Sequence, residues 1–346
     1  MAYQALTLST VADNLKQNYG NLLVDNLFKQ GIKGRLVPSD SLLGWLREEG
    51  RVMLDGADSS DRYAREWGVH ITGDTANSFD ANSAYPTSTV EGFDRAVLSW
   101  SRVGIPIAWD NLAGLSNGVA RGGLNQIAID FELKLKELFS EIDIHLAGDG
   151  TGNSSLDIIG FQGAMTTASS YAGISQSNAY WQGAIGAAGS VDLTEALIET
   201  NLETLENSKG GIAEGMAFLL NIVQYHKLKN IYKDSIRFND GDQMGNPFRA
   251  MWTNGQKEFP ILVNKSVPTD ELWMIPSSVC EMRVKTGGNP LGIDSAEDEV
   301  LMDEGFPLHL EEIHSQNDQK QLMIKFYGQL VVTNPTKIGA ITGLAT

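Results

Sequence analysis

The chain has 346 residues, of which 42% are hydrophobic, and a formal net charge of −17. This length and apolar content exclude a disordered protein and predict a sizeable core divided between at least two lobes. The negative charge argues against a sequence-independent nucleic-acid binder, because such a surface would repel phosphates.

The cysteine content and the search for targeting segments indicate the compartment in which the protein is expected. Cys280 is the single cysteine, which excludes an internal disulfide. Residues 1–8 have neither a basic start nor an apolar run, and no run in the chain approaches the roughly 18 apolar residues of a membrane span. We therefore expect a protein of a reducing cytosol, without a secretory signal.

Residues 1–50 are predicted to form an arm of two helices. Thr10 can cap the first helix, and Gly31 ends it. Five residues share its apolar face: Val11, Leu15, Tyr19, Leu22 and Leu27. The second helix is expected from Ser41 to Glu49. Two short helices cannot bury their faces on each other alone, so we expect the arm to lie on the main body or on a neighbouring subunit.

A long β-hairpin is predicted next. Polar and apolar residues alternate from Arg62 to Thr72 and from Val97 to Trp109, and the stretch between them, Gly73 to Val90, is rich in small and polar residues. A two-stranded hairpin is marginal by itself, so its apolar side needs a partner surface. Three tryptophans lie on or beside it: Trp67, Trp100 and Trp109. Packing on the same chain and packing on a neighbour are equally expected for them, because aromatic residues are enriched in both settings.

Ser116 to Leu146 are predicted to form an amphipathic helix of roughly 45 Å, long enough to act as a strut. Its apolar face is formed by residues spaced three or four apart: Leu124, Ile127, Phe131, Leu135, Leu138 and Ile142. The opposite face carries charged residues: Asp130, Lys134, Glu137 and Glu141. The glycines of Gly148–Gly152 are expected to end the helix.

The following 140 or so residues predict a compact α/β lobe. Gly160–Met165 is expected as a loop and Ile185–Gly189 as a linker of small residues. Asp192 to Glu195 reads as a capping box that starts a helix ending near Asn207. The further elements expected are strand Met216–Leu220, helix Gln224–Lys233, and strands Phe259–Val263, Leu272–Ile275 and Val279–Val284.

Two strands are predicted near the C-terminal end, Leu308 to Ile313 and Gln321 to Thr333. The second is long and mostly apolar, so we expect it to be buried beside the strut helix. This places the α/β lobe as an insertion between two halves of a central domain.

Catalytic and metal-binding motifs are weak. Gly114 to Gly118 match the G-x-S-x-G pattern of hydrolases, but a hairpin precedes them instead of a parallel sheet, so Ser116 is better explained as a helix N-cap. A serine hydrolase acting through Ser116 remains an alternative. His309 and His314 lack the spacing of a helical zinc motif, and Asp149–Asn153 lacks the glycine and the distal glutamate of a calcium loop.

Several short stretches, together with the order of the predicted elements, resemble one protein family. The stretches are Gly148–Gly152 followed by Gly160–Gly163, Tyr171–Ile174, Tyr180–Trp181, Ala217–Asn221 with Tyr225–Lys227, Phe259–Val263, and Asn334–Thr336 with Ile341–Gly343. Over nearly the whole chain they resemble the major capsid protein of tailed bacteriophages, which has the Hong Kong 97-like fold. Phe259 departs from the family pattern, in which glycine is usual at this position.

The resemblance implies an α+β protein with five parts. They are an N-terminal arm at 1–50, an extended loop at 51–107, a P-domain with the spine helix at 108–153, an inserted α/β A-domain at 154–297, and P-domain return strands with the C-terminus at 298–346. It also implies a structural, non-enzymatic protein without cofactor or metal. Pentamers and hexamers would build an icosahedral virion capsid around double-stranded DNA in the host bacterial cytoplasm.

The expected partners are other copies of the chain, the portal, scaffolding and decoration proteins of a phage, and DNA packaged without sequence specificity. Contacts between subunits are expected at ten residues: Leu15, Leu22, Leu27, Tyr63, Trp67, Val69, Ile71, Phe79, Tyr85 and Trp100. Some family members join subunits by an isopeptide bond from a lysine of the extended loop, but residues 51–107 contain no lysine. We therefore expect a non-covalent shell. An encapsulin-type compartment, which shares the fold and encloses a cargo enzyme, is the alternative.

Overall fold

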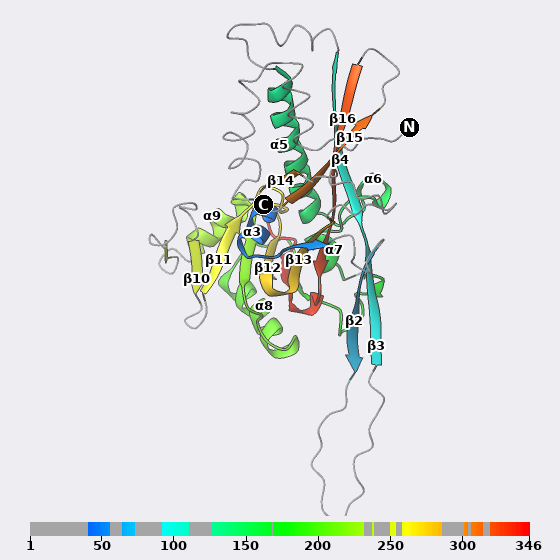
Figure 1. Cartoon of the computed structure of the whole chain (residues 1–346). Helices are drawn as coiled ribbons and strands as arrows, with labels where there is room; N and C mark the ends of the chain where they lie inside the picture. Colours follow the sequence, from blue (N-terminus) through cyan, green and yellow to red (C-terminus); the bar gives the residue numbers. More distant parts are fainter. Residues whose placement is uncertain are drawn as a thin grey trace, which may run out of the picture.

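The computed structural model describes the main body of the chain (Figure 1). The described ranges are 41–55, 64–72, 92–110, 126–167, 169–231, 237–238, 250–253, 258–285, 301–303, 306–313 and 319–346. The predicted first helix, the hairpin tip at Gly73 to Val90 and Ser116 lie outside these ranges. None of the helices within them has the length and apolar character needed to cross a membrane.

A six-stranded sheet is built around one long strand, β16 (Gln319–Val332). Along one edge β16 pairs with β4 (Ser101–Asp110) over ten residues. Along the other edge it pairs first with β15 (Phe306–Ile313) and then with β13 (Cys280–Lys285). The two outer strands are β1 (Val52–Asp55) beside β13, and β14 (Leu301–Asp303) beside β15. Both edges of β16 are thus hydrogen-bonded. Its apolar residues Ile324, Phe326, Leu330, Val331 and Val332 are buried, as predicted for this strand.

A seven-stranded sheet forms the core of the lobe. Its order is β7 (Ala184–Ala187), β17 (Gly339–Thr342), β12 (Leu272–Pro276), β8 (Met216–Leu220), β11 (Glu258–Val263), β10 (Ala250–Thr253) and β9 (Arg237–Phe238). Helices α8 (Glu195–Ser208) and α9 (Ile222–Ile231) share a hydrophobic cluster with one face of it, through residues such as Leu205, Leu228 and Phe218. The other face, which includes Leu219 and Trp273, belongs to the cluster of the central body.

Two strands belong to a different sheet from the strands that precede them in the sequence. Strand β13 belongs to the six-stranded sheet although it follows the lobe strands directly, and β17 returns from the end of the chain to lie between β7 and β12 in the lobe sheet. Two local predictions were wrong. Ile185–Gly189 is not a plain linker, because Ala184–Ala187 forms β7, and Gly160–Met165 is not a plain loop, because Phe161–Met165 forms helix α7. In both cases pairing or packing with distant residues supplies the order that the local sequence lacks.

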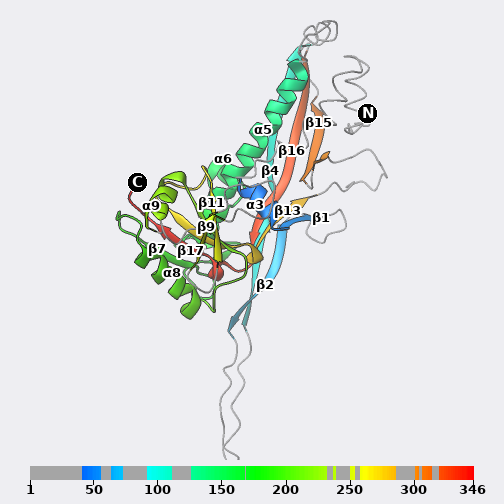
Figure 2. The same ribbon diagram turned by 90° about the vertical axis from the view of Figure 1, so that its left-hand side faces the viewer.

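The strut helix α5 (Gln126–Ala147) packs on β4, the neighbour of β16 in the sheet, and gives this part of the molecule its elongated shape (Figure 2). Leu135, Leu138 and Ile142 are buried on its inner face, and Asp130, Glu137 and Glu141 are exposed, as the spacing predicted. The helix ends at Ala147, just before Gly148. It is followed by the short helix α6 (Gly152–Ser155), α7, and the small strands β5 (Ser170–Tyr171) and β6 (Ile174–Ser175).

The hairpin differs from its prediction in one strand. Strand β2 (Ala64–Thr72) pairs with β3 (Gly92–Ser99), so the strand begins earlier than the expected Val97. The expected strand is interrupted at Trp100, and its second half is β4, which pairs with β16 of the body instead of β2. One continuous extended segment therefore belongs first to the hairpin and then to the central sheet.

A buried carboxylate joins α5 to two other parts of the body. Helix α3 (Leu42–Glu48) lies within the predicted range Ser41 to Glu49, has Ser41 as its N-cap, and packs against α5. The amides of Leu42 and Leu43 donate to Asp143 Oδ1 at 2.5 and 3.3 Å. The other oxygen, Oδ2, accepts from Asn264 Nδ2 at 3.0 Å. Asp143 therefore satisfies donors from α3 and from the lobe, which lie more than 100 residues away in sequence in either direction.

Removing this carboxylate should destabilise the folded subunit. In Asp143→Ala, buried N–H groups of α3 and Asn264 lose their acceptor, so we expect the free energy of unfolding to fall by about 2 to 4 kcal/mol. Urea denaturation followed by tryptophan fluorescence measures the change. Asp130→Ala, at an exposed position of the same helix, is the control and should change the value by less than about 0.5 kcal/mol. Equal effects of the two substitutions would contradict this role for Asp143.

Candidate functional site

The region that distinguishes this fold from a compact domain is the hairpin and the surface on which it is anchored. We call this region the hairpin root and define it as the described residues of β2 and β3 together with the body segments 171–181 and 333–336. The paired strands β2 and β3 project beyond the body (Figure 1). The contacts that hold the hairpin are therefore those at the end of the strands that meets the body.

A chain of aromatic rings anchors the inner face of the hairpin. Trp67 on β2 donates from Nε1 to the carbonyl of Thr333 at 3.2 Å, and its ring lies 6.3 Å from that of Trp181. Trp181 is fully buried, donates to the carbonyl of Tyr171 at 3.0 Å, and stacks on the Tyr171 ring. Val69 packs on the same core. The hairpin is therefore fixed to its own chain by both packing and directed hydrogen bonds.

Tyr171 connects this aromatic chain to the central strand. Its hydroxyl accepts from the amide of Val332 at 2.8 Å and lies 3.5 Å from the carbonyl of Leu330. Burial raises the pKa of Tyr171 well above its ordinary value, so the phenol stays protonated. A neutral hydroxyl can accept one hydrogen bond and donate another, which allows it to satisfy two backbone groups of β16.

The outer face of the hairpin carries an exposed aromatic residue. Phe93 on β3 is 68% exposed, and its ring meets that of His70 edge-on at 5.4 Å. Beside them Arg95 forms an ion pair with Glu66 across the two strands. Phe93 is thus a single exposed aromatic side chain flanked by charged groups, and on its own it does not mark an interface.

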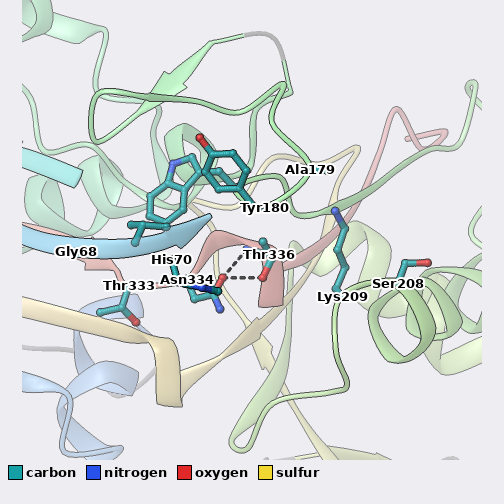
Figure 3. A pocket seen from close by; sticks show the side chains of 11 residues that line it. Gly68, His70, Ala179, Tyr180, Ser208, Lys209, Thr333, Asn334 and Thr336 are labelled. Atoms are coloured by element: carbon teal, nitrogen blue, oxygen red, sulfur yellow. Dashed lines mark hydrogen bonds between the residues drawn. The ribbon is translucent and has the colours of Figure 1, made fainter. Parts of the chain in front are cut away.

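A hollow of about 470 Å³ lies between the hairpin root and the end of α8. Figure 3 shows the Lys209 side chain, at the end of α8, extending toward the segment that carries Ala179 and Tyr180. Asn334 Oδ1 accepts from the Thr336 hydroxyl at 2.6 Å on another wall. Burial lowers the pKa of Lys209. The lining residues are Gly68, Val69, His70, Ala179, Tyr180, Trp181, Ser208, Lys209, Thr333, Asn334 and Thr336.

The predicted contact residues fall into two groups. Leu15, Leu22, Leu27, Tyr63, Phe79 and Tyr85 lie outside the described residues. Of the others, Trp67 and Val69 pack on the body of the same chain, Ile71 is half-buried, and Lys285 Nζ lies 5.5 Å from the centre of the Trp100 ring. A contact of these residues with a neighbouring subunit stays a prediction.

Sequence reasoning missed the buried polar side chains that hold the parts together. Gln329 accepts from the Ser101 hydroxyl at 3.0 Å and donates to the carbonyl of Ile159 at 3.1 Å. Asn201 on α8 donates to the carbonyls of Ala184 and Ala340, at 3.2 and 3.0 Å. No local pattern marks these residues, because most of their partners are more than 100 positions away.

No reactive constellation is seen in the described part of the chain. It contains no group of three His, Cys, Asp or Glu side chains placed to hold a metal ion. Cys280 is fully buried, and burial raises the pKa of its thiol, so the thiolate that would react is strongly disfavoured. His145 lies 3.3 Å from Glu141 and 3.5 Å from Asp157, without a nucleophile in this group.

Comparison with known proteins identifies the fold. No protein-family model and no curated protein sequence matches the chain. The structure is similar to the capsid asymmetric unit of cyanophage A-1(L), with a TM-score of 0.69 and 17% identity over 89% of this chain and 93% of that one. It is also similar to the capsid of a native GTA particle, with a TM-score of 0.57 and 12% identity over 96% and 99% of the two chains.

A third similar structure is the holo-SrpI encapsulin complex from Synechococcus elongatus, with a TM-score of 0.53 and 8% identity over 87% of this chain and 88% of that one. The chain thus has the fold of proteins that form closed shells. Its mixed α+β architecture is that of phage capsid structures, as the resemblance to the Hong Kong 97-like fold predicted. The division into the five named parts stays a prediction.

Removing the Trp67 ring should loosen the hairpin root. Trp67→Ala deletes a half-buried ring and its bond to Thr333, and we expect the local opening free energy of β2 to fall by about 2 kcal/mol. Hydrogen exchange of the β2 amides should accelerate accordingly, while exchange in β8 of the lobe stays unchanged. Phe93→Ala, on the outer face of the same hairpin, is the matched control. Unaltered exchange in β2 of Trp67→Ala would show that the root is held in another way.

Proposed function

We propose that this chain is the major capsid protein of a tailed bacteriophage, a structural protein whose copies assemble into a closed shell around DNA. The observation that carries the proposal is the similarity of fold over almost the entire length to the cyanophage and GTA capsid structures. The matches cover 89% and 96% of this chain, and the chain itself has a projecting hairpin and an elongated α5–β16 part, which a compact domain would lack.

The shape of the molecule supports self-association. The projecting hairpin exposes Phe93, and within the described part of the chain the hairpin packs on the body through its inner face. We infer that pentamers and hexamers form when projecting parts of each subunit lie on neighbours, and that closed symmetry multiplies contacts that are individually weak. The ten predicted contact residues belong to this proposal.

The net charge of the chain bears on how tightly the proposed shell would hold DNA. With a formal charge of −17 per chain, a shell of many copies would hold DNA loosely, because the phosphates are repelled. We infer that the force for packaging comes from another protein, and that DNA is enclosed without sequence-specific contacts. Portal, scaffolding and decoration proteins are the proposed protein partners.

Electron microscopy of the expressed chain is the direct test. We expect closed particles or rings of five and six subunits, alone or on co-expression with a scaffolding protein. A compact monomer at high concentration, with the hairpin tip protected from protease by its own body, would contradict the proposal.

The encapsulin-type compartment is the second candidate, favoured by the similarity to the Synechococcus elongatus shell. Such a shell would enclose a cargo protein in place of a genome. The ratio of absorbance at 260 and 280 nm of particles purified from their natural source separates the two. An enzymatic role through Ser116 is not proposed, because the similar structures are shell proteins.

Shortening the hairpin should separate folding from assembly. Deleting residues 73–90 removes the tip and leaves β2 and β3, so we expect a folded subunit with unchanged circular dichroism but at least tenfold fewer stable particles, since shell stability depends on total contact area. Sedimentation measures the particle yield. Normal yield together with normal heat resistance would contradict a role of the tip in contacts between subunits.

The proposed shell should dissociate completely under denaturing conditions. Residues 51–107 contain no lysine, so an isopeptide bond from this loop cannot form. Denaturing electrophoresis of intact particles should therefore give a single band at the monomer mass of 37.6 kDa. A ladder of covalent multimers would contradict the prediction.

A further inference from the structure

The hollow between the hairpin root and the end of α8 is lined by a cation and by no carboxylate. Its volume of about 470 Å³ lies in the range of small-molecule sites. Its walls come from four parts of the chain: 68–70 of β2, 179–181, 208–209 at the end of α8, and residues within 333–336. Lys209 is the only lysine or arginine of the lining, which contains no aspartate or glutamate (Figure 3). The lining therefore favours a negatively charged occupant, although the whole chain has a formal charge of −17.

The ammonium group of Lys209 forms no ion pair with the described residues. Figure 3 shows its side chain extending from the end of α8 toward Ala179 and Tyr180. Burial lowers the pKa of Lys209, whereas a neighbouring carboxylate would raise it. A partly buried charge has lost hydration that an ion-pair partner would offset. Within the described part of the chain, this lysine thus lacks a counter-ion.

The carbonyl groups at the end of α8 do not need the charge of Lys209, because another lysine satisfies them. Lys337 Nζ donates to three carbonyls at 2.8, 2.6 and 3.3 Å, those of Lys209, Gly210 and Gly211. These carbonyls carry the partial negative charge of a helix C-terminus. One lysine therefore neutralises the end of the helix, and the ammonium group of the other is left to the hollow.

Two further groups of the lining are hydrogen-bond donors without an acceptor among the described residues. One is the hydroxyl of Ser208. The other is the Nδ2 group of Asn334, whose Oδ1 accepts from the amide and the hydroxyl of Thr336 at 3.2 and 2.6 Å. An ammonium group, a hydroxyl and an amide N–H are all donors to the oxygen atoms of an anion.

One carboxylate contacts a residue of the lining, but its oxygens have other partners. Asp94 Oδ2 on β3 accepts from the hydroxyl of Tyr180 at 3.4 Å, and Asp94 Oδ1 accepts from the amide of Arg95 at 2.8 Å. The Tyr180 hydroxyl in turn accepts from Asn178 Nδ2 at 3.0 Å. Asp94 is therefore part of a separate hydrogen-bonded group and is not the counter-ion of Lys209.

We propose that the hollow binds a small oxyanion, a phosphate or a carboxylate group, with Lys209 as its ion-pair partner and Ser208 and Asn334 as hydrogen-bond donors. The walls belong both to β2 and to the end of α8, so a bound anion holds the hairpin root against the lobe. This inference concerns the single chain and does not depend on the proposed shell.

Lysine labelling of the full-length chain, at a concentration at which subunits do not associate, tests the proposal. The rate at which a limiting acylating reagent modifies Lys209 is measured by peptide mass spectrometry in sodium phosphate, sodium acetate and sodium chloride of equal ionic strength. By mass action, labelling should be about fivefold slower at an anion concentration about four times the dissociation constant. Lys229, an exposed residue of α9, is the control and should be labelled equally in all three salts.

Hydrogen exchange in two matched variants gives the second measurement. The same anion should slow exchange of the β2 amides at 68–70 about fivefold, because opening of the hairpin root would break the site. Lys209→Met should lose this effect and Lys229→Met should keep it. Protection by phosphate alone or by acetate alone supports the proposal and identifies the group that is bound.

Two results would overturn the proposal. The first is labelling of Lys209 that neither anion slows at up to about 100 mM, a concentration well above a millimolar dissociation constant. Slow labelling that is the same in all three salts belongs to this result, because it would show that the chain itself fills the hollow. The second is an effect of the anion on β2 exchange that survives in Lys209→Met.

Discussion

Strand β16 is the constraint on which the rest of the molecule depends. Its edges are occupied by β4 on one side and by β15 and β13 on the other, and these partners come from widely separated parts of the chain. Because β4 continues from the hairpin strand β3, the pairing of β4 with β16 also determines where the hairpin leaves the body. A slip of one residue in this register would turn the apolar side chains of β16 toward the wrong face, so the hydrophobic core itself specifies the position of the hairpin.

Buried polar side chains fix how the parts meet. Asp143 joins α5 to α3 and to the lobe, Gln329 joins β16 to β4 and to the segment before α7, and Tyr171 joins the aromatic anchor to β16. Apolar packing alone tolerates small shifts, whereas an unsatisfied buried donor or acceptor is costly. These three side chains therefore restrict the arrangement to one geometry. That restriction matters for a protein whose proposed function is to present the same projecting surfaces in every copy.

The proposed shell distributes its stability over many surfaces. The described part of the chain has no group of side chains placed to hold a metal ion. Its exposed large apolar residues are scattered over several elements: Leu54, Phe93, Leu133, Ile144, Leu156, Val191 and Ile222. Such surfaces contribute little one at a time. In a closed symmetric assembly each contact recurs in every subunit, so weak contacts and an acidic chain are compatible with a stable container.

Local signals in the sequence were enough to determine several of the elements. The spacing of Leu135, Leu138 and Ile142 predicted the buried face of α5, Ser41 predicted the start of α3, and the apolar run Met216–Leu220 predicted β8, because each signal depends on neighbours along the chain. The resemblance of short stretches and of the element order to the phage capsid family was sufficient to predict the fold. The boundary between β3 and β4, the pairing of β17 with the lobe sheet and the roles of Asp143, Gln329 and Trp67 were decided only by tertiary structure. Their partners are mostly remote in sequence, and strand pairing and buried hydrogen bonds leave no periodic signal in the residues that make them.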